Sequence, residues 1–85
     1  MSFAFEVTPG EVLEVMEAHK AADALEDEIV DDGFAAVVEM EDRITEAVLE
    51  YADESTRRAF ALREIEAILI EEGLLEGPSR FATLE

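Results

Sequence analysis

The chain has 85 residues, 49% of them apolar, and its 23 acidic and 6 basic residues give a formal net charge of −17. This length predicts one domain with a small core, and the apolar content is too high for a disordered acidic tail. The charge excludes direct binding to nucleic acid or anionic membranes and favours basic protein partners. Because the sequence has no cysteine, it excludes disulfides and every metal site built on thiolates.

Neither a secretion signal nor a membrane span is indicated by the sequence. Nothing at its start combines a basic region with an apolar run, and no apolar stretch approaches the roughly 20 residues that a span requires. We therefore expect a soluble, cytoplasmic protein.

The beginning of the sequence predicts an extended arm followed by a long helix. Residues 1–7 alternate apolar with small or polar side chains, which is typical of extended chain. Thr8, Pro9 and Glu11 then form a strong helix start, with threonine at the N-cap, proline at the first helical position and glutamate closing a capping box. Apolar residues at three- and four-residue spacing extend the predicted helix over 9–32.

A second helix is predicted over 34–53, because the same apolar spacing recurs from Val37 to Tyr51. Gly33 is the predicted hinge between the two helices. A link this short favours an antiparallel helical hairpin. The alternative is one continuous helix interrupted at Gly33, which would need an oligomer to bury its apolar stripe.

The most apolar helix is predicted over 55–73. Ser55 is its expected N-cap, and Gly73 its expected stop, because a left-handed glycine lets the following Leu74 fold back onto the helix. Arginines early in this helix are expected to pair with acids of the two preceding helices or with an acidic surface elsewhere: Arg57, Arg58 and Arg63. Its apolar residues complete the predicted core: Ile65, Ile68 and Leu69.

The predicted fold is therefore all-α, a small antiparallel three-helix bundle built from a helical hairpin and a third helix, in one domain over 1–85. An extended N-terminal arm precedes the helices. Gly77 and Pro78 prevent the last helix from continuing, so residues 76–85 are predicted to form a C-terminal tail.

No catalytic or metal-binding motif is present. A di-iron helix needs glutamate three residues before histidine, but Met16 holds that position relative to His19. Ser2, Ser55 and Ser79 lack the glycine-flanked turn of a nucleophilic serine. We therefore expect no enzyme activity, no metal and no cofactor, and interpret His19 as a partly exposed structural residue.

Acidic residues gather on the first two predicted helices. Like charges one turn apart are unfavourable in a helix, so stability alone does not explain them. Their spacing of about 5 to 6 Å is comparable with that of phosphates along one DNA strand, which suggests a nucleic-acid mimic. A solvated surface or adaptation to salt is the alternative. The predicted acidic face comprises Glu26, Asp27, Asp31, Asp32, Glu39, Asp42, Glu46 and Glu50.

The segment from Arg58 to Leu75 reads Arg-Ala-Phe-Ala-Leu-Arg-Glu-Ile-Glu-Ala-Ile-Leu-Ile-Glu-Glu-Gly-Leu-Leu. It resembles the N-terminal helix of nitrile hydratase and thiocyanate hydrolase catalytic subunits, which typically reads Arg-x-x-Ala-Leu-Glu-x-Leu-Leu-x-Glu-Lys-Gly-Leu. Its two ends are also similar to a helix in that family's non-catalytic subunit and accessory proteins. The family's metal site needs a cysteine-rich claw, so for this cysteine-free chain the resemblance implies a small subunit or accessory protein that docks on a metal-bearing partner.

The leading hypothesis is thus a non-catalytic interaction protein that docks on a larger protein, as a small subunit or accessory piece of a nitrile-hydratase-type assembly. A hetero-oligomer is expected, with a homodimer as the alternative. The second hypothesis is a nucleic-acid-mimicking inhibitor of a basic DNA- or RNA-binding protein, whose binding, unlike apolar docking, should weaken steeply with salt. The predicted docking residues are Phe60, Ile70, Leu74, Phe81 and Leu84.

Overall fold

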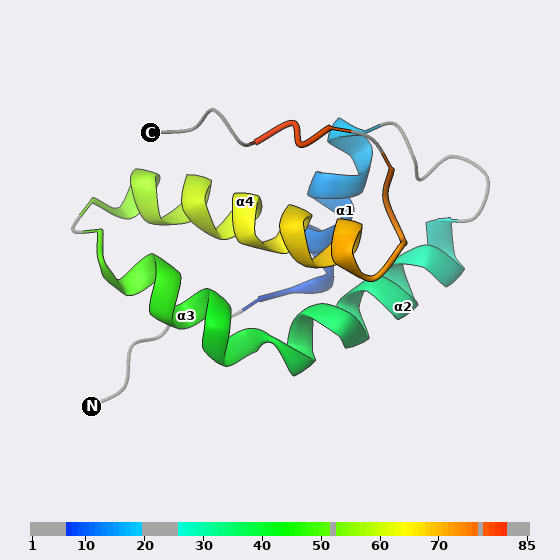
Figure 1. The fold of residues 1–85 in the computed structure, drawn as a ribbon, viewed down its shortest axis with the longest axis horizontal. Helices are drawn as coiled ribbons and strands as arrows, with labels where there is room; N and C mark the ends of the chain where they lie inside the picture. Colours follow the sequence, from blue (N-terminus) through cyan, green and yellow to red (C-terminus); the bar gives the residue numbers. More distant parts are fainter. Residues whose placement is uncertain (1–6, 20–25, 52, 77, 82–85) are drawn as a thin grey trace.

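The computed structural model describes residues 7–19, 26–51, 53–76 and 78–81. These residues form four helices and no strand: α1 (Pro9–Ala18), α2 (Glu26–Glu39), α3 (Glu41–Leu49) and α4 (Glu54–Glu71) (Figure 1). The all-helical class predicted from the sequence is confirmed. The three-helix bundle is not confirmed, because the described part of the chain contains four helices.

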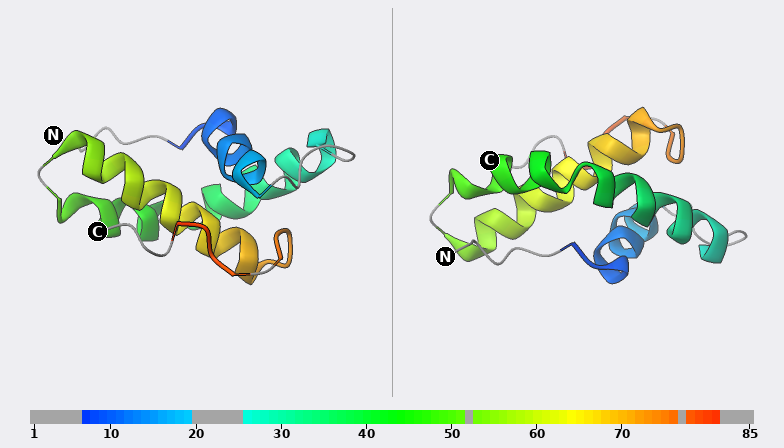
Figure 2. Two further views of the ribbon diagram at one scale, coloured as in Figure 1. Left: turned by 90° about the horizontal axis from the view of Figure 1, so that it is seen from above. Right: turned by 90° about the horizontal axis from the view of Figure 1, so that it is seen from below.

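Helix α4 lies at the centre of the arrangement, and each of the other three helices packs against it. α3 runs antiparallel beside α4, and α2 meets the start of α3 at an angle, so that α2 and α3 form a bent pair along one side of α4 (Figure 1). α1 lies across α2 and α4 (Figure 2). None of the described helices is both long enough and apolar enough to cross a membrane.

The predicted start of the first helix is confirmed, but its predicted length is wrong. The Thr8 hydroxyl accepts a hydrogen bond from the Glu11 amide at 3.3 Å, and the Glu11 carboxylate accepts one from the Thr8 amide at 3.1 Å, which completes the capping box. α1 ends at Ala18 instead of continuing to residue 32. The segment 20–25 lies outside the described residues, and α1 packs back against α2, which a single continuous helix would not allow.

Gly33 is not a hinge, because α2 runs through it. It is buried where α1, α2 and α4 meet: a Cβ atom there would lie 2.8 Å from Met16 Cε, 3.0 Å from Leu69 Cδ2 and 3.2 Å from Val12 Cγ1. Glycine is present because a side chain would hold the helices apart. The helix break falls instead at Met40, so the predicted second helix over 34–53 is divided between the end of α2 and α3.

The start of α4 also differs from the prediction. Its N-cap is Asp53, not Ser55, because the Asp53 carboxylate accepts hydrogen bonds from the amide and the hydroxyl of Thr56 at 2.9 and 3.0 Å. These two hydrogen bonds lower the pKa of the Asp53 carboxyl, and the bond from the Thr56 amide has the larger effect.

The end of α4 is as predicted. Gly73 has a φ of +80°, the left-handed conformation that glycine adopts without strain. The Leu74 amide donates to the Leu69 carbonyl at 2.9 Å and the Gly73 amide to the Ile70 carbonyl at 3.0 Å, which are the two bonds of a Schellman motif.

The core lies between α4 and the other three helices. The predicted core residues Ile65, Ile68 and Leu69 are fully buried. The predicted arm lies outside the described residues except for Val7, which is buried. Of the predicted tail, residues 78–81 run antiparallel along α4, and we call them the C-terminal strap (Figure 1). Fully buried partners of α4 come from each of the other helices: Val12, Val15, Met16, Val37, Ile44 and Val48.

Candidate functional site

A buried carboxylate joins α1, α4 and the C-terminal strap. Glu66 of α4 is fully buried among the apolar residues of the core. Its oxygens accept hydrogen bonds from His19 Nε2 at 2.6 Å, from the Ser79 hydroxyl and from the amides of Arg80 and Phe81. Because a carboxylate can only accept, His19 carries a proton on Nε2. Glu66 therefore holds three consecutive strap residues, Ser79, Arg80 and Phe81, against the helices.

The hydrogen bonds around Glu66 decide its charge. Burial by itself raises the pKa of this carboxyl, but the bonds donated by Ser79, Arg80, His19 and Phe81 outweigh burial and lower the pKa below the ordinary value of 4.5. Glu66 is thus an ionised, buried carboxylate whose lone pairs are well satisfied. Such a group stabilises the fold only while its donors stay in place.

Ser79 and His19 do not bond to each other beside Glu66. A Ser–His nucleophilic pair needs a hydrogen bond between the two side chains, but Ser79 and His19 each donate to Glu66 instead. The side chain of His19 is 6% exposed, so it is more buried than the partly exposed residue that the sequence predicts. Across the described residues, no group of three or more His, Cys, Asp or Glu side chains is arranged to hold a metal ion.

The side of α2 and α3 that faces away from α4 has the opposite character. Among the described residues, the exposed large apolar side chains are Val38 and Leu49, which are 44% and 48% exposed. They stand among exposed carboxylates that form no ion pair or hydrogen bond within the described part of the chain. We call this surface the outer face, and it comprises Asp31, Asp32, Ala35, Val38, Glu39, Asp42, Glu46, Leu49 and Glu50.

Six of the eight predicted acidic residues belong to the outer face. The other two, Glu26 and Asp27, lie in the first turn of α2, and their side chains are outside the described part. The structure thus brings most of the predicted acids onto two adjoining helices.

The predicted docking residues are used largely within the molecule. The Phe60 ring stacks on Tyr51 with 4.0 Å between centroids and 11° between planes. Ile70, Leu74 and Phe81 are partly buried against the core, and Leu84 lies outside the described residues. Whether the partly exposed atoms of the first four contact another protein stays a prediction.

Ion pairs link the helices on the α4 side. Arg58 pairs with Glu14 of α1, as predicted for this arginine, and the pair raises the pKa of Arg58. Arg43 of α3 pairs with Glu64 and Glu71 of α4 at 3.5 and 3.2 Å. All three pairs are partly exposed and therefore stabilise the protein only weakly.

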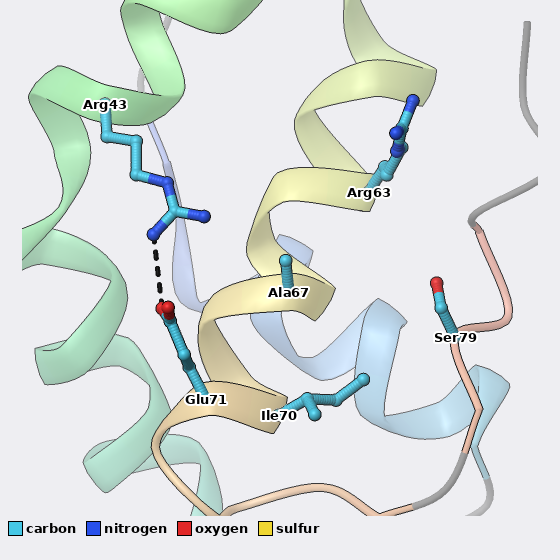
Figure 3. Close-up of a pocket in the computed structure, with 6 residues that line it drawn as sticks. All are labelled: Arg43, Arg63, Ala67, Ile70, Glu71 and Ser79. Atoms are coloured by element: carbon cyan, nitrogen blue, oxygen red, sulfur yellow. Dashed lines mark hydrogen bonds and ion pairs between the residues drawn. The ribbon is translucent and has the colours of Figure 1, made fainter.

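Two open pockets flank the strap along α4. One, of about 400 Å³, is lined by side chains from α3, α4 and the strap: Arg43, Arg63, Ala67, Ile70, Glu71 and Ser79 (Figure 3). The other, of about 330 Å³, is lined by Ser55, Arg58, Ala59, Leu62 and Phe81.

Sequence reasoning missed both Glu66 and the pair of exposed apolar residues. The available signal for Glu66 was its position, because it lies one helical turn after Leu62 on the buried side of the most apolar helix. The sequence does not distinguish Val38 and Leu49 from buried apolar residues, because apolar periodicity does not show which side chains pack against another helix.

Comparison with known proteins gives no relative from which a function can be inferred: no family model, curated protein or solved structure matches the chain.

Proposed function

We propose that this protein is a non-catalytic interaction protein that docks on a basic protein partner through the outer face of α2 and α3. The observation that carries the proposal is the exposure of Val38 and Leu49 among unpaired carboxylates. The non-catalytic part is supported by the bonding of Ser79 and His19, which both serve Glu66.

The composition of the outer face suits binding to a basic surface. Specific interfaces combine an apolar centre with a polar rim, and a few anchoring side chains supply most of the binding free energy. Carboxylates around such anchors attract a basic partner over a distance and raise the association rate. Carboxylates without cations nearby also repel one another, and a basic partner relieves that repulsion.

The test is an affinity pull-down from the source organism's lysate with the wild type and two variants. The double substitution Val38→Ser and Leu49→Ser removes the anchors, and we expect it to weaken capture of a basic partner at least about tenfold, equivalent to about 1.4 kcal/mol. Neutralising Asp42, Glu46 and Glu50 with Asn or Gln should slow association most strongly at low salt.

A control of equal charge comes from the other side of the molecule. Glu54, Glu72 and Glu76 are exposed outside α2 and α3, and replacing all three by Gln changes the net charge as much as neutralising three outer-face acids. This control should capture the partner like the wild type. If the outer-face variant and this control lose capture of the partner equally, net charge alone explains the loss, and a defined docking face is contradicted.

A second candidate function uses the same carboxylates. A nucleic-acid mimic would bind a basic nuclease, polymerase or similar enzyme through charge alone, and the exposure of all six described outer-face acids favours it. Binding would then fall steeply with salt and survive Val38→Ser with Leu49→Ser. Loss of binding in that apolar variant favours docking.

A finer form of the docking proposal identifies the partner with the metal-bearing subunit of a nitrile-hydratase-type enzyme. It is supported by the resemblance of residues 58–75, which fall on α4 and its glycine stop. The test is size-exclusion chromatography with a purified catalytic subunit. Co-elution at about 1 M NaCl, where the Debye length is near 3 Å, together with its loss in Ile70→Asp, would support this form. Separate elution of the wild type would contradict it.

A further inference from the structure

The pocket between α3 and the C-terminal strap has an apolar floor, and the side chain of Arg63 at its edge extends away from that floor, toward Phe60 (Figure 3). Ala67 and Ile70 lie between Arg43 and Glu71 on one side and Arg63 and Ser79 on the other (Figure 3). Its volume of about 400 Å³ is within the range of sites that accept a small group of side chains.

The arginines of this pocket differ in their bonding. Arg43 is already paired with two carboxylates of α4. Arg63 forms no ion pair within the described residues, although acids outnumber bases by 23 to 6 in the chain. Its guanidinium carbon lies 5.5 Å from the centroid of the Phe60 ring, and that ring is stacked on Tyr51. Arg63 is therefore held by aromatic contact, and its hydrogen-bond donors are available to a ligand.

We propose that this pocket binds an acidic segment of a protein partner, with an apolar side chain on Ala67 and Ile70 and a carboxylate on Arg63. A guanidinium recognises a carboxylate through two parallel hydrogen bonds. Ser79 forms part of the wall only, because its hydroxyl donates to Glu66. This inference is independent of the proposed function, because it concerns a pocket on another side of the molecule and an acidic partner, whereas the outer face is proposed to bind a basic one.

The need for an apolar side chain follows from the net charge of −17. The field of the whole protein repels a small free anion, so one exposed arginine cannot concentrate it. An apolar group next to the carboxylate adds burial against Ala67 and Ile70, and this contribution is independent of charge. The ligand is therefore a peptide segment that carries both groups, not an isolated carboxylate.

The experiment is a titration of the ¹⁵N-labelled protein followed by NMR. The probe is N-acetyl-leucyl-glutamate, and acetate and N-acetyl-leucinamide each supply one half of its chemistry. We expect the dipeptide to shift the amides of Ala67 and Ile70 and the Nε–Hε signal of Arg63, whereas acetate and the leucinamide produce shifts at least about tenfold smaller at equal concentration.

Three variants test the assignment. Arg63→Gln should weaken dipeptide binding at least about tenfold. Ala67→Leu, which fills the floor with a good helix former and changes no charge, should abolish it. Arg80→Gln changes the net charge equally, keeps the backbone bond to Glu66 and should bind like the wild type. The proposal is overturned if the dipeptide shifts none of these signals, if acetate shifts them equally, or if Arg63→Gln and Arg80→Gln behave alike. Wild-type-like spectra of the free variants establish that each is folded.

Discussion

Glu66 and the outer face of α2 and α3 place the same chemical group in opposite surroundings. The carboxylate of Glu66 is fully buried and receives hydrogen bonds from four residues. The six carboxylates of the outer face are exposed and receive none within the described part of the chain. Acidity thus has two separate roles in this protein: one carboxylate organises the interior, and the others remain available to solvent or to a partner.

The contrast explains how a chain of net charge −17 can fold. A buried charge is costly to leave without partners, so the fold surrounds Glu66 with donors from α1 and the strap. Exposed charges are solvated and repel one another only by tenths of a kcal/mol per pair, which the core can tolerate. The predictions below test each side of this contrast, beginning with the largest effect.

Removing the buried carboxylate should be the most damaging change. Glu66→Ala leaves the donors of His19, Ser79 and the strap amides without an acceptor, and we expect the free energy of unfolding to fall by about 3 kcal/mol or more. Urea denaturation measures the change. Glu64→Ala on the same helix is the control: its partly exposed pair with Arg43 should cost less than about 1 kcal/mol. Similar losses in both variants would remove the distinction between interior and surface.

The outer face depends on the position of α2, which Gly33 fixes against α1 and α4. Gly33→Val should lower the free energy of unfolding by about 1–3 kcal/mol or more, because the new side chain overlaps Met16, Leu69 and Val12. Gly10→Ala is the matched control, since its Cβ would meet only Thr8 Oγ1 at 3.7 Å. That variant should be unchanged or up to about 1 kcal/mol more stable in thermal unfolding. A neutral Gly33→Val would show that the helices do not need this close approach.

Acid should weaken the stabilising contribution of Glu66. The folded-state pKa of Glu66 lies below its ordinary value of 4.5, so its stabilising contribution is complete above about pH 4.5 and is lost as the pH falls through the folded-state pKa. The advantage of the wild type over Glu66→Gln, measured by urea denaturation at each pH, should therefore be constant near neutrality and shrink below about pH 4.5. If the stability advantage of the wild type over Glu66→Gln grew in acid, the pKa of Glu66 would have to be raised in the folded state, not lowered.

Neutralising outer carboxylates should produce the smallest effect. Glu46 and Glu50 are one turn apart near the C-terminus of α3, where negative charge also opposes the helix dipole. Replacing both by Gln should raise the free energy of unfolding by a few tenths of a kcal/mol at low salt, and about 1 M NaCl should remove the gain. Asp42→Asn, in the first turn of α3, should be slightly destabilising. A clear loss of stability in the double variant would mean that these side chains hold the fold.

Local sequence chemistry determined the helical class and two helix ends. The capping box of Thr8 and Glu11 and the glycine stop at Gly73 each depend on residues within one or two turns, so both were readable without knowledge of the fold. The burial of Ile65, Ile68 and Leu69 followed from the apolar periodicity of one segment.

The tertiary structure alone decided where the chain bends and which polar group enters the core. Gly33 has the local chemistry of a stop, but it remains helical because α1 and α4 need room at that point. Glu66 has the local chemistry of a surface residue, and its environment comes from His19, 47 positions earlier, and from the strap. The physical reason is range: caps and stops depend on bonds within a few residues, whereas close approach and burial depend on segments that meet only when the chain has folded.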